Sequence, residues 1–176
     1  AIFRDGDYVG SIEPETARGA SMLLGVAGHG DLAVTDRDGS TVMLTLDSCK
    51  TDFRPVWDDD GTLARVDVTL KLRAGIAELR VPRRITVREY QDELNAALAA
   101  LVTGWAEDVI AASQALGADF LGVGQALAIG GGRRWAAIRD DWPAVWQSVP
   151  VHVTVSADVG RTFDLRDSID SSGGGT

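Results

Sequence analysis

TVREYQDELNAALAALVTGWAEDVIAASQAL, residues 86–116, is the longest regularly patterned stretch of the chain. Its apolar residues recur at steps of three and four, which places them on one face of an α-helix: Val87, Tyr90, Leu94, Leu98, Leu101, Trp105, Val109, Ala112 and Leu116. Thr86 and Glu89 match a capping box at the start, and Gly117 follows the end. At about 1.5 Å per residue this helix is about 46 Å long, so it needs a broad apolar surface to lie on.

Strands before and after this helix are predicted to supply that surface. Apolar and polar residues alternate around residues 32–35, 41–47, 63–79 and 150–156. In the third of these strands the inward positions are Val66, Val68, Leu70 and Leu72, while the charged residues between them face solvent. The sequence therefore predicts an α+β fold, in which a curved, mainly antiparallel sheet packs on one long helix plus shorter C-terminal helices.

Shorter elements flank these strands. Asp5-Gly6 predicts a small hairpin over residues 2–12, Pro14 begins a helix that runs to about Gly25, and Asp-Gly turns join the later strands. After Gly117, Asp119 is expected to cap a helix that Gly130-Gly131-Gly132 interrupts. Trp142 precedes a proline and is therefore expected to be extended or in a turn.

Composition favours one domain of ordinary size. The chain has 176 residues, of which 45% are hydrophobic, enough for a single core. We expect one domain over residues 1–166 and a disordered, Gly-rich tail over residues 167–176. The formal net charge of −9 repels phosphate backbones and makes nucleic acid a poor partner. No apolar run approaches the ~18 residues of a membrane span, and the single cysteine, Cys49, excludes an internal disulfide.

No motif predicts catalysis or a bound cofactor. Gly28-His29-Gly30 and the three residues after it match a dinucleotide pattern, but the helix precedes and the strand follows, the reverse of the required order. The aspartate-rich turns 36–39 and 58–61 lack the spacing of a calcium loop. His29, His152 and Cys49 are too few and too scattered for zinc, and there is no G-x-S-x-G elbow. We therefore assign no catalytic, cofactor-binding or metal-binding residue, expect no cofactor, and predict that the chain is not an enzyme.

Four tryptophans, Trp105, Trp135, Trp142 and Trp146, gather in the C-terminal third, where they either form core or contact a partner. Core is favoured. Trp105 lies on the apolar stripe of the long helix and is expected to be buried between the sheet and the C-terminal helices. Gly122 and Gly124 are interpreted as a close-packing device and not as a phosphate cradle.

The segment 117–124, GADFLGVG, followed by Arg134-Trp135 and Asp141-Trp142, resembles the C-terminal domain of the spore-germination GerAC, or Ger(x)C, family. The strand 150–155, PVHVTV, stands where the last strand of that family belongs. Val9-Gly10 with residues 15–19, and residues 75–78, also match in collinear order. Two departures are Gly130-Gly131-Gly132, at a place usually polar or basic, and Phe163, near a common closing glycine.

This resemblance implies a non-catalytic subunit of a germinant receptor, acting in nutrient-triggered spore germination. Its partners would be the integral-membrane A-type and B-type subunits, at the outer face of the inner spore membrane. The lipid anchor would lie outside this chain, since Cys49 is internal, and this fragment itself would be soluble. Two functions remain open: an interaction domain, or a small-ligand-binding domain that uses the concave face of the sheet. An enzyme of unknown type is a third, weaker hypothesis.

Overall fold

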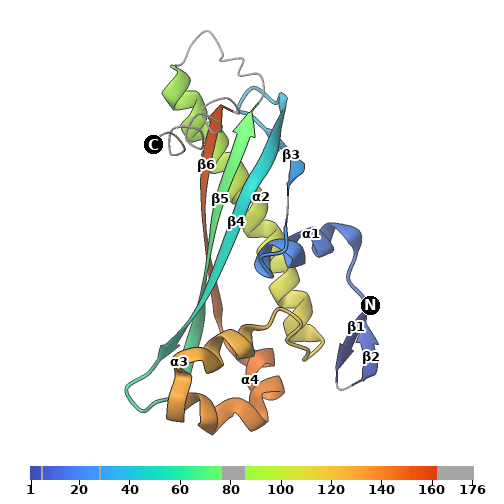
Figure 1. The fold of residues 1–176 in the computed structure, drawn as a ribbon, viewed down its shortest axis with the longest axis vertical. Helices are drawn as coiled ribbons and strands as arrows, with labels where there is room; N and C mark the ends of the chain where they lie inside the picture. Colours follow the sequence, from blue (N-terminus) through green and yellow to red (C-terminus); the bar gives the residue numbers. More distant parts are fainter. Residues whose placement is uncertain (5, 28, 77–85, 162–176) are drawn as a thin grey trace, which may run out of the picture. The chain divides into compact units, whose positions relative to one another are not determined.

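The computed structural model describes residues 1–4, 6–27, 29–76 and 86–161. The elements follow the chain in this order: β1 (Ile2–Arg4), β2 (Asp7–Gly10), α1 (Pro14–Leu23), β3 (Gly30–Thr35), β4 (Thr41–Trp57), β5 (Leu63–Ile76), α2 (Val87–Ala115), α3 (Val123–Ile138), η1 (Arg139–Asp141), α4 (Trp142–Ser148) and β6 (Val151–Arg161). The predicted α+β class is confirmed, with a four-stranded sheet packed on a long helix plus C-terminal helices (Figure 1).

The sheet has the order β3-β4-β5-β6, and β1 pairs with β2 in a separate antiparallel hairpin. β3 and β4 are antiparallel, with Gly30 opposite Leu46 and Thr35 opposite Thr41. β4 and β5 are joined by the short turn at Asp58–Gly61, whereas β5 and β6 run in the same direction (Figure 1). A parallel pair needs a long crossover connection, and here that connection consists of α2, α3, η1 and α4. The sheet is therefore mainly antiparallel, as predicted, with one parallel pair.

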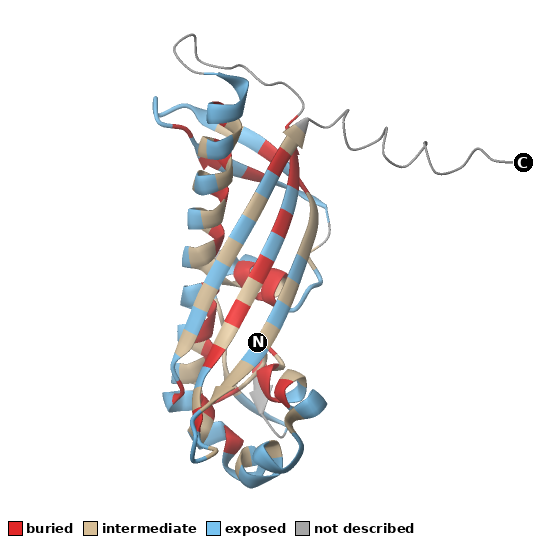
Figure 2. Cartoon of the chain, turned by 90° about the vertical axis from the view of Figure 1, so that its left-hand side faces the viewer, coloured by how far each residue is buried: buried red, intermediate tan, exposed pale blue. Residues whose placement is uncertain are grey.

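Sequence patterns placed the strands and the long helix well. The inward positions of β5, at Val66, Val68, Leu70 and Leu72, are at most 2% exposed, and Figure 2 shows buried bands alternating with less buried ones along the strands. β4 continues beyond the predicted region to Trp57. α2 is one unbroken helix. The end of the predicted strand at 77–79, the Phe163 departure and the tail 167–176 lie outside the described residues.

The capping box at the start of α2 is confirmed. The Thr86 N–H donates to a Glu89 carboxylate oxygen at 2.7 Å, and the Glu89 N–H donates to the Thr86 hydroxyl at 3.2 Å. These bonds satisfy backbone donors that have no partner within the helix. By length and composition α2 could also cross a membrane. Its buried residues, however, follow one stripe, as in an amphipathic helix that covers a sheet.

That stripe differs from the predicted one in its second half. Tyr90, Leu94 and Leu98 are buried as expected, but the stripe continues through Val102 and Ala106 and not through Leu101 and Trp105, which are half-buried. Both paths satisfy helical spacing, and the sequence-based prediction selected the larger side chains. The structure places the smaller ones inward.

The described residues divide into two compact units. The strands β4, β5 and β6 and the helix α2 each have residues in both units. The prediction of one domain over 1–166 stays a prediction. The unit Ala27–Cys49, Lys71–Val102 and Val155–Thr176 holds the β3–β4 hairpin and the first half of α2. Here the turn of the hairpin is bonded to α2, because Arg37 pairs with Glu93 and the Tyr90 hydroxyl donates to Asp36 at 3.1 Å.

In the same unit, two amide side chains of α2 form hydrogen bonds with the backbone of the last strand, β6. The Val159 N–H donates to the Asn95 side-chain oxygen at 2.7 Å, and the Gln91 amide donates to the Val159 carbonyl at 3.4 Å. β6 is an edge strand, so these bonds satisfy backbone groups that no neighbouring strand pairs.

The second unit, Ala1–Val26, Lys50–Leu70 and Thr103–Thr154, holds α1, α3 and α4. In it α1 approaches the second half of α2 so closely that a Cβ added to Gly19 would lie 2.6 Å from the Trp105 carbonyl oxygen. The Thr51 hydroxyl on β4 donates to the Met22 carbonyl at 2.8 Å, which connects α1 to the sheet. Glycine at position 19 is therefore required by this helix contact.

Candidate functional site

Asp119 organises the segment that carries the family resemblance. Its carboxylate accepts three hydrogen bonds: from the Val123 N–H at 3.0 Å, from the Gly124 N–H at 2.6 Å and from the Trp142 indole N–H at 2.9 Å. The first two cap α3, which confirms the predicted role of Asp119. The third, which the sequence analysis missed, connects the start of α3 to the start of α4.

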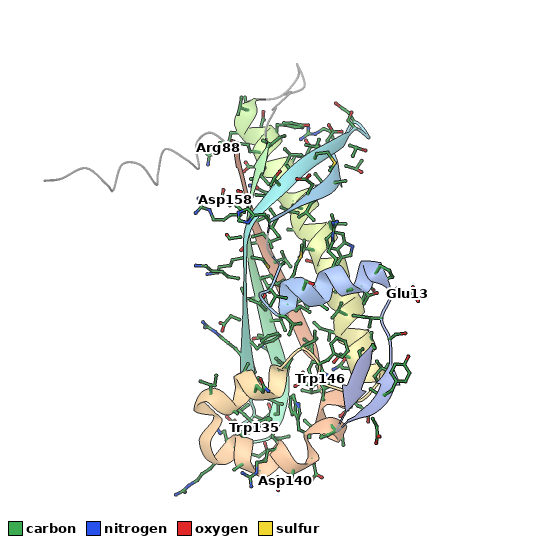
Figure 3. The ribbon with its side chains drawn as sticks, turned by 45° about the vertical axis from the view of Figure 1, so that its right-hand side comes forward. Glu13, Arg88, Trp135, Asp140, Trp146 and Asp158 are labelled. Carbon is green, nitrogen blue, oxygen red and sulfur yellow. The ribbon has the colours of Figure 1, made fainter. Side chains whose placement is uncertain are left out.

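Three tryptophans pack behind this carboxylate. Trp142 stacks on Trp146 with ring centroids 5.8 Å apart, and Trp135 meets Trp142 edge-on at 5.3 Å. Trp146 is fully buried, and its indole N–H donates to the Ser113 hydroxyl at 2.9 Å, which in turn donates to the Ala118 carbonyl at 2.7 Å. Trp135 and Trp146 lie among the helices, whereas Asp140 points outward (Figure 3). The core interpretation of Trp142 and Trp146 is confirmed.

Gly124 serves this packing. A Cβ added there would lie 2.6 Å from the Trp142 indole nitrogen and 3.0 Å from the Trp135 ring. Gly122 adopts a positive φ of 73° immediately before α3. The predicted close packing is therefore confirmed for Gly124, whereas Gly122 is needed for its positive φ and a Cβ there would have only the Gln125 side-chain oxygen nearby, at 3.9 Å.

Trp142 is helical, with φ −50° and ψ −42°, so the expectation of an extended or turn geometry is wrong. Proline disfavours a helical residue before it but does not forbid one. Here the burial of Trp142 and its bond to Asp119 favour the helical conformation. Pro143 then occupies the first turn of α4, where no N–H donor is required.

Trp105 is also placed differently from the prediction. Its side chain is half-buried, and it contacts α1, where the Arg18 guanidinium lies 5.7 Å from the ring centroid. It is therefore a contact between two helices and not the centre of the core. Trp146 occupies the fully buried position.

The aspartate-rich turns use their carboxylates to bind their own backbone. Asp36 accepts from the N–H groups of Asp38 and Ser40 at 3.0 and 2.8 Å, and Asp60 accepts from the Thr62 N–H at 2.8 Å. These are the bonds of ordinary aspartate turns. Among the described residues, no three His, Cys, Asp or Glu side chains gather as a metal site would require.

A shallow acidic groove lies beside the β3–β4 turn, lined by Arg37, Glu89, Asp92, Glu93 and Ala96. The N–H and hydroxyl of Thr86 hold the pKa of Glu89 below its usual value. Burial, and then the hydrogen bond to Asp36, raise the pKa of the nearby Tyr90. Since Arg37 and the capping box already engage two of the three carboxylates, the groove is a structural feature.

His152 and the buried Ser113 lie in different surroundings, and in the described part of the chain neither forms a catalytic constellation. His152 on β6 lies 3.9 Å from Asp67 on the solvent-facing side of the sheet, with the Asp67 pKa lowered mainly by its hydrogen bond from Arg65. Ser113, the buried serine of the tryptophan cluster, has Trp146 and Ala118 as its bonding partners, and neither is a base. Gly30 begins β3, so the glycine-rich pattern before it leads into a strand and not a helix.

Several large apolar side chains in the described part of the chain are exposed to solvent. The most exposed large hydrophobic residue in the described part of the chain is Ile129, at 86%. It stands at the kink inside α3, where Ile129, Gly130 and Gly132 leave helical geometry. This confirms the predicted break at the three glycines. Arg133 and Arg134 follow the kink and are exposed.

The sequence of residues 1–163 matches the family model described as spore germination B3/GerAC like, C-terminal. Among solved structures, the chain is similar to one titled "Crystal Structure of the GerBC protein", with a TM-score of 0.72 and 15% sequence identity. The match covers 84% of this chain and 46% of that one, so this chain spans about half the length of its relative. At this identity the structural likeness shows the fold alone. No curated protein matches the sequence.

Proposed function

Because the chain belongs to the spore germination B3/GerAC-like C-terminal family, we propose that it is a non-catalytic interaction domain of a germinant-receptor lipoprotein subunit. Its role would be in nutrient-triggered germination. The A-type and B-type integral-membrane subunits are its proposed partners. The parent protein would be held at the outer face of the inner spore membrane by a lipid anchor outside this chain.

The observation that carries this proposal is that polar side chains of the signature segment and of the core beside it are bonded within the fold. The Asp119 carboxylate accepts three bonds from groups within the fold, and the Ser113 hydroxyl is bonded on both sides within the core. A catalytic acid, base or nucleophile must face a space where substrate can bind. Because these polar groups already bond to other groups of the fold, they support a structural role. We infer that the domain functions through contacts made by its surface.

The alternative is a small-ligand-binding domain that uses the concave face of the sheet. A binding site needs a cavity with several converging polar groups. The helix-facing side of β5 instead carries apolar side chains that are almost completely buried, among them Val66, Leu70 and Leu72. Core packing there leaves little room for a ligand, which favours the interaction domain.

A titration with small germinants separates the two functions. Amino acids, sugars and nucleosides would be added in turn to the ¹⁵N-labelled domain, and amide chemical shifts recorded. An interaction domain shows no saturable shift with any of them. Saturable shifts confined to residues on the helix-facing side of β4 and β5 would favour the alternative and reject the proposal.

A further inference from the structure

The segment around the α3 kink has a charge opposite to that of the whole chain. Residues 120–139 contain no aspartate or glutamate and three arginines, whereas the chain has a formal net charge of −9. Arg139 pairs with Asp140 at 3.0 Å. Arg133 and Arg134 have no acidic partner among the residues that the structure describes. Two neighbouring cations thus lack an ion-pair partner in the described part of an acidic protein, although Arg134 lies near Trp57, which the aspartates of the 58–61 turn follow.

The kink also exposes apolar surface. We define the α3 turn as residues 128–134, in which every residue except Gly131 is exposed. Ile129 is the most prominent, with 86% of its surface open to solvent. The space where a Cβ would stand on Gly130 or Gly132 is free of other atoms within 4 Å. A flat surface could therefore approach the backbone itself.

The turn is held in place from behind. A Cβ added to Gly131 would lie 2.6 Å from the Trp135 Cβ, and Trp135 in turn packs edge-on against Trp142. The Arg134 guanidinium lies 5.9 Å from the centroid of the Trp57 ring, a contact that orients the charge without neutralising it. Ile129, Arg133 and Arg134 are thus exposed within one short turn whose backbone packs on the tryptophan cluster, so binding has little backbone ordering to impose.

We propose that the α3 turn is a contact site for an anionic lipid bilayer. Ile129 enters the boundary between headgroups and acyl chains, while Arg133 and Arg134 bind lipid phosphates, which guanidinium groups match in geometry. The exposure of the turn and its two arginines without an ion-pair partner in the described residues favour an anionic surface as the occupant. One aliphatic side chain and two arginines support only weak, reversible binding. The inference goes beyond the proposed function and does not depend on it.

Two measurements test this site with purified chain and protein-free vesicles. The first is co-sedimentation with vesicles of phosphatidylglycerol and phosphatidylcholine in equal parts, compared with phosphatidylcholine alone, at low and high salt. Binding is expected on the anionic vesicles only and should weaken as salt rises. Arg133→Gln/Arg134→Gln should reduce the partition coefficient about fivefold for each arginine. The matched control, Arg54→Gln/Arg65→Gln, removes the same charge from exposed positions on β4 and β5 and should reduce it less than about twofold.

The second measurement tests insertion in a Cys49→Ser background. An environment-sensitive fluorophore on Ile129→Cys should shift to the blue with anionic vesicles, whereas the same label on Val26→Cys, another exposed apolar position, should not. Circular dichroism confirms that each variant is folded. The proposal is overturned if the Ile129 label does not shift, if both labels shift equally, or if the two double-arginine variants bind equally well.

Discussion

Replacing Trp146 with alanine should impair folding far more than replacing Trp105. Trp146 is fully buried, and truncation of a buried tryptophan costs about 3–5 kcal/mol in transfer energy and cavity. The stack on Trp142 adds about 0.5–1.5 kcal/mol. The Ser113 hydroxyl keeps its own acceptor on Ala118, so losing the indole donor leaves no unpaired donor behind. Together these give a loss of about 3.5–6.5 kcal/mol, which is a large share of the ~5–15 kcal/mol that stabilises a domain.

Trp105 is half-buried and contacts α1 from outside the core stripe. Its replacement should cost about 1–2 kcal/mol, part of which is the contact with Arg18. Urea unfolding followed by far-ultraviolet circular dichroism measures both values without depending on tryptophan fluorescence. The order of the two variants is the decisive result. If Trp105→Ala destabilises more than Trp146→Ala, or if Trp146→Ala stays within about 0.5 kcal/mol of the parent chain, the account of the core is wrong.

Four further predictions follow from single contacts. Gly104→Ala should stabilise the chain by about 1 kcal/mol, because Gly104 is exposed inside α2 and no atom lies within 4 Å of the added methyl group; a lower melting temperature would contradict this. Gly124→Ala should destabilise by about 1–3 kcal/mol, since the methyl group would meet the Trp142 indole nitrogen at 2.6 Å; an unchanged urea midpoint would refute the close packing. The raised pKa of Tyr90 means that its stabilising contribution is complete below the ordinary value of 10.0 and is lost as pH rises through the higher folded-state value. The free energy of unfolding of Tyr90→Phe should therefore fall less than that of the parent chain between about pH 9 and 11. Equal falls in the two proteins would show that the pKa of Tyr90 is the same in the folded and unfolded chains. The melting temperature should not respond to EDTA, because the aspartate turns bind their own backbone; a fall of several degrees would reveal a bound cation.

Periodicity in the sequence predicted the strands and α2 because burial on one face leaves a direct pattern of apolar residues. The clearest case is β5, where Val66, Val68 and Leu70 alternate with polar residues and all three are buried. The capping box at Thr86 and Glu89 is equally local, and its geometry is as expected. These features depend on residues a few positions apart.

Contacts between distant residues explain what the sequence could not predict. Val102 and Ala106 are buried in place of Leu101 and Trp105, and helical spacing, which fits both paths, does not reveal which of them faces the neighbouring elements. The direction of β6 depends on the crossover through α2 to α4. The helical conformation of Trp142 depends on a bond to Asp119, 23 residues earlier in the chain. Asp119 itself was recognised as a cap, but its second role required the positions of both helices.

Binding of the purified domain to the A-type and B-type membrane subunits tests the interaction proposal most directly. The subunits would be reconstituted together in nanodiscs of neutral lipid, so that binding to anionic lipid does not contribute, and association measured by biolayer interferometry. The account predicts saturable binding that is weakened in Trp146→Ala in proportion to the fraction of that variant that is unfolded, and retained in full in Gly104→Ala. Binding no stronger than that to empty nanodiscs would contradict the proposal that this chain is an interaction domain of the receptor.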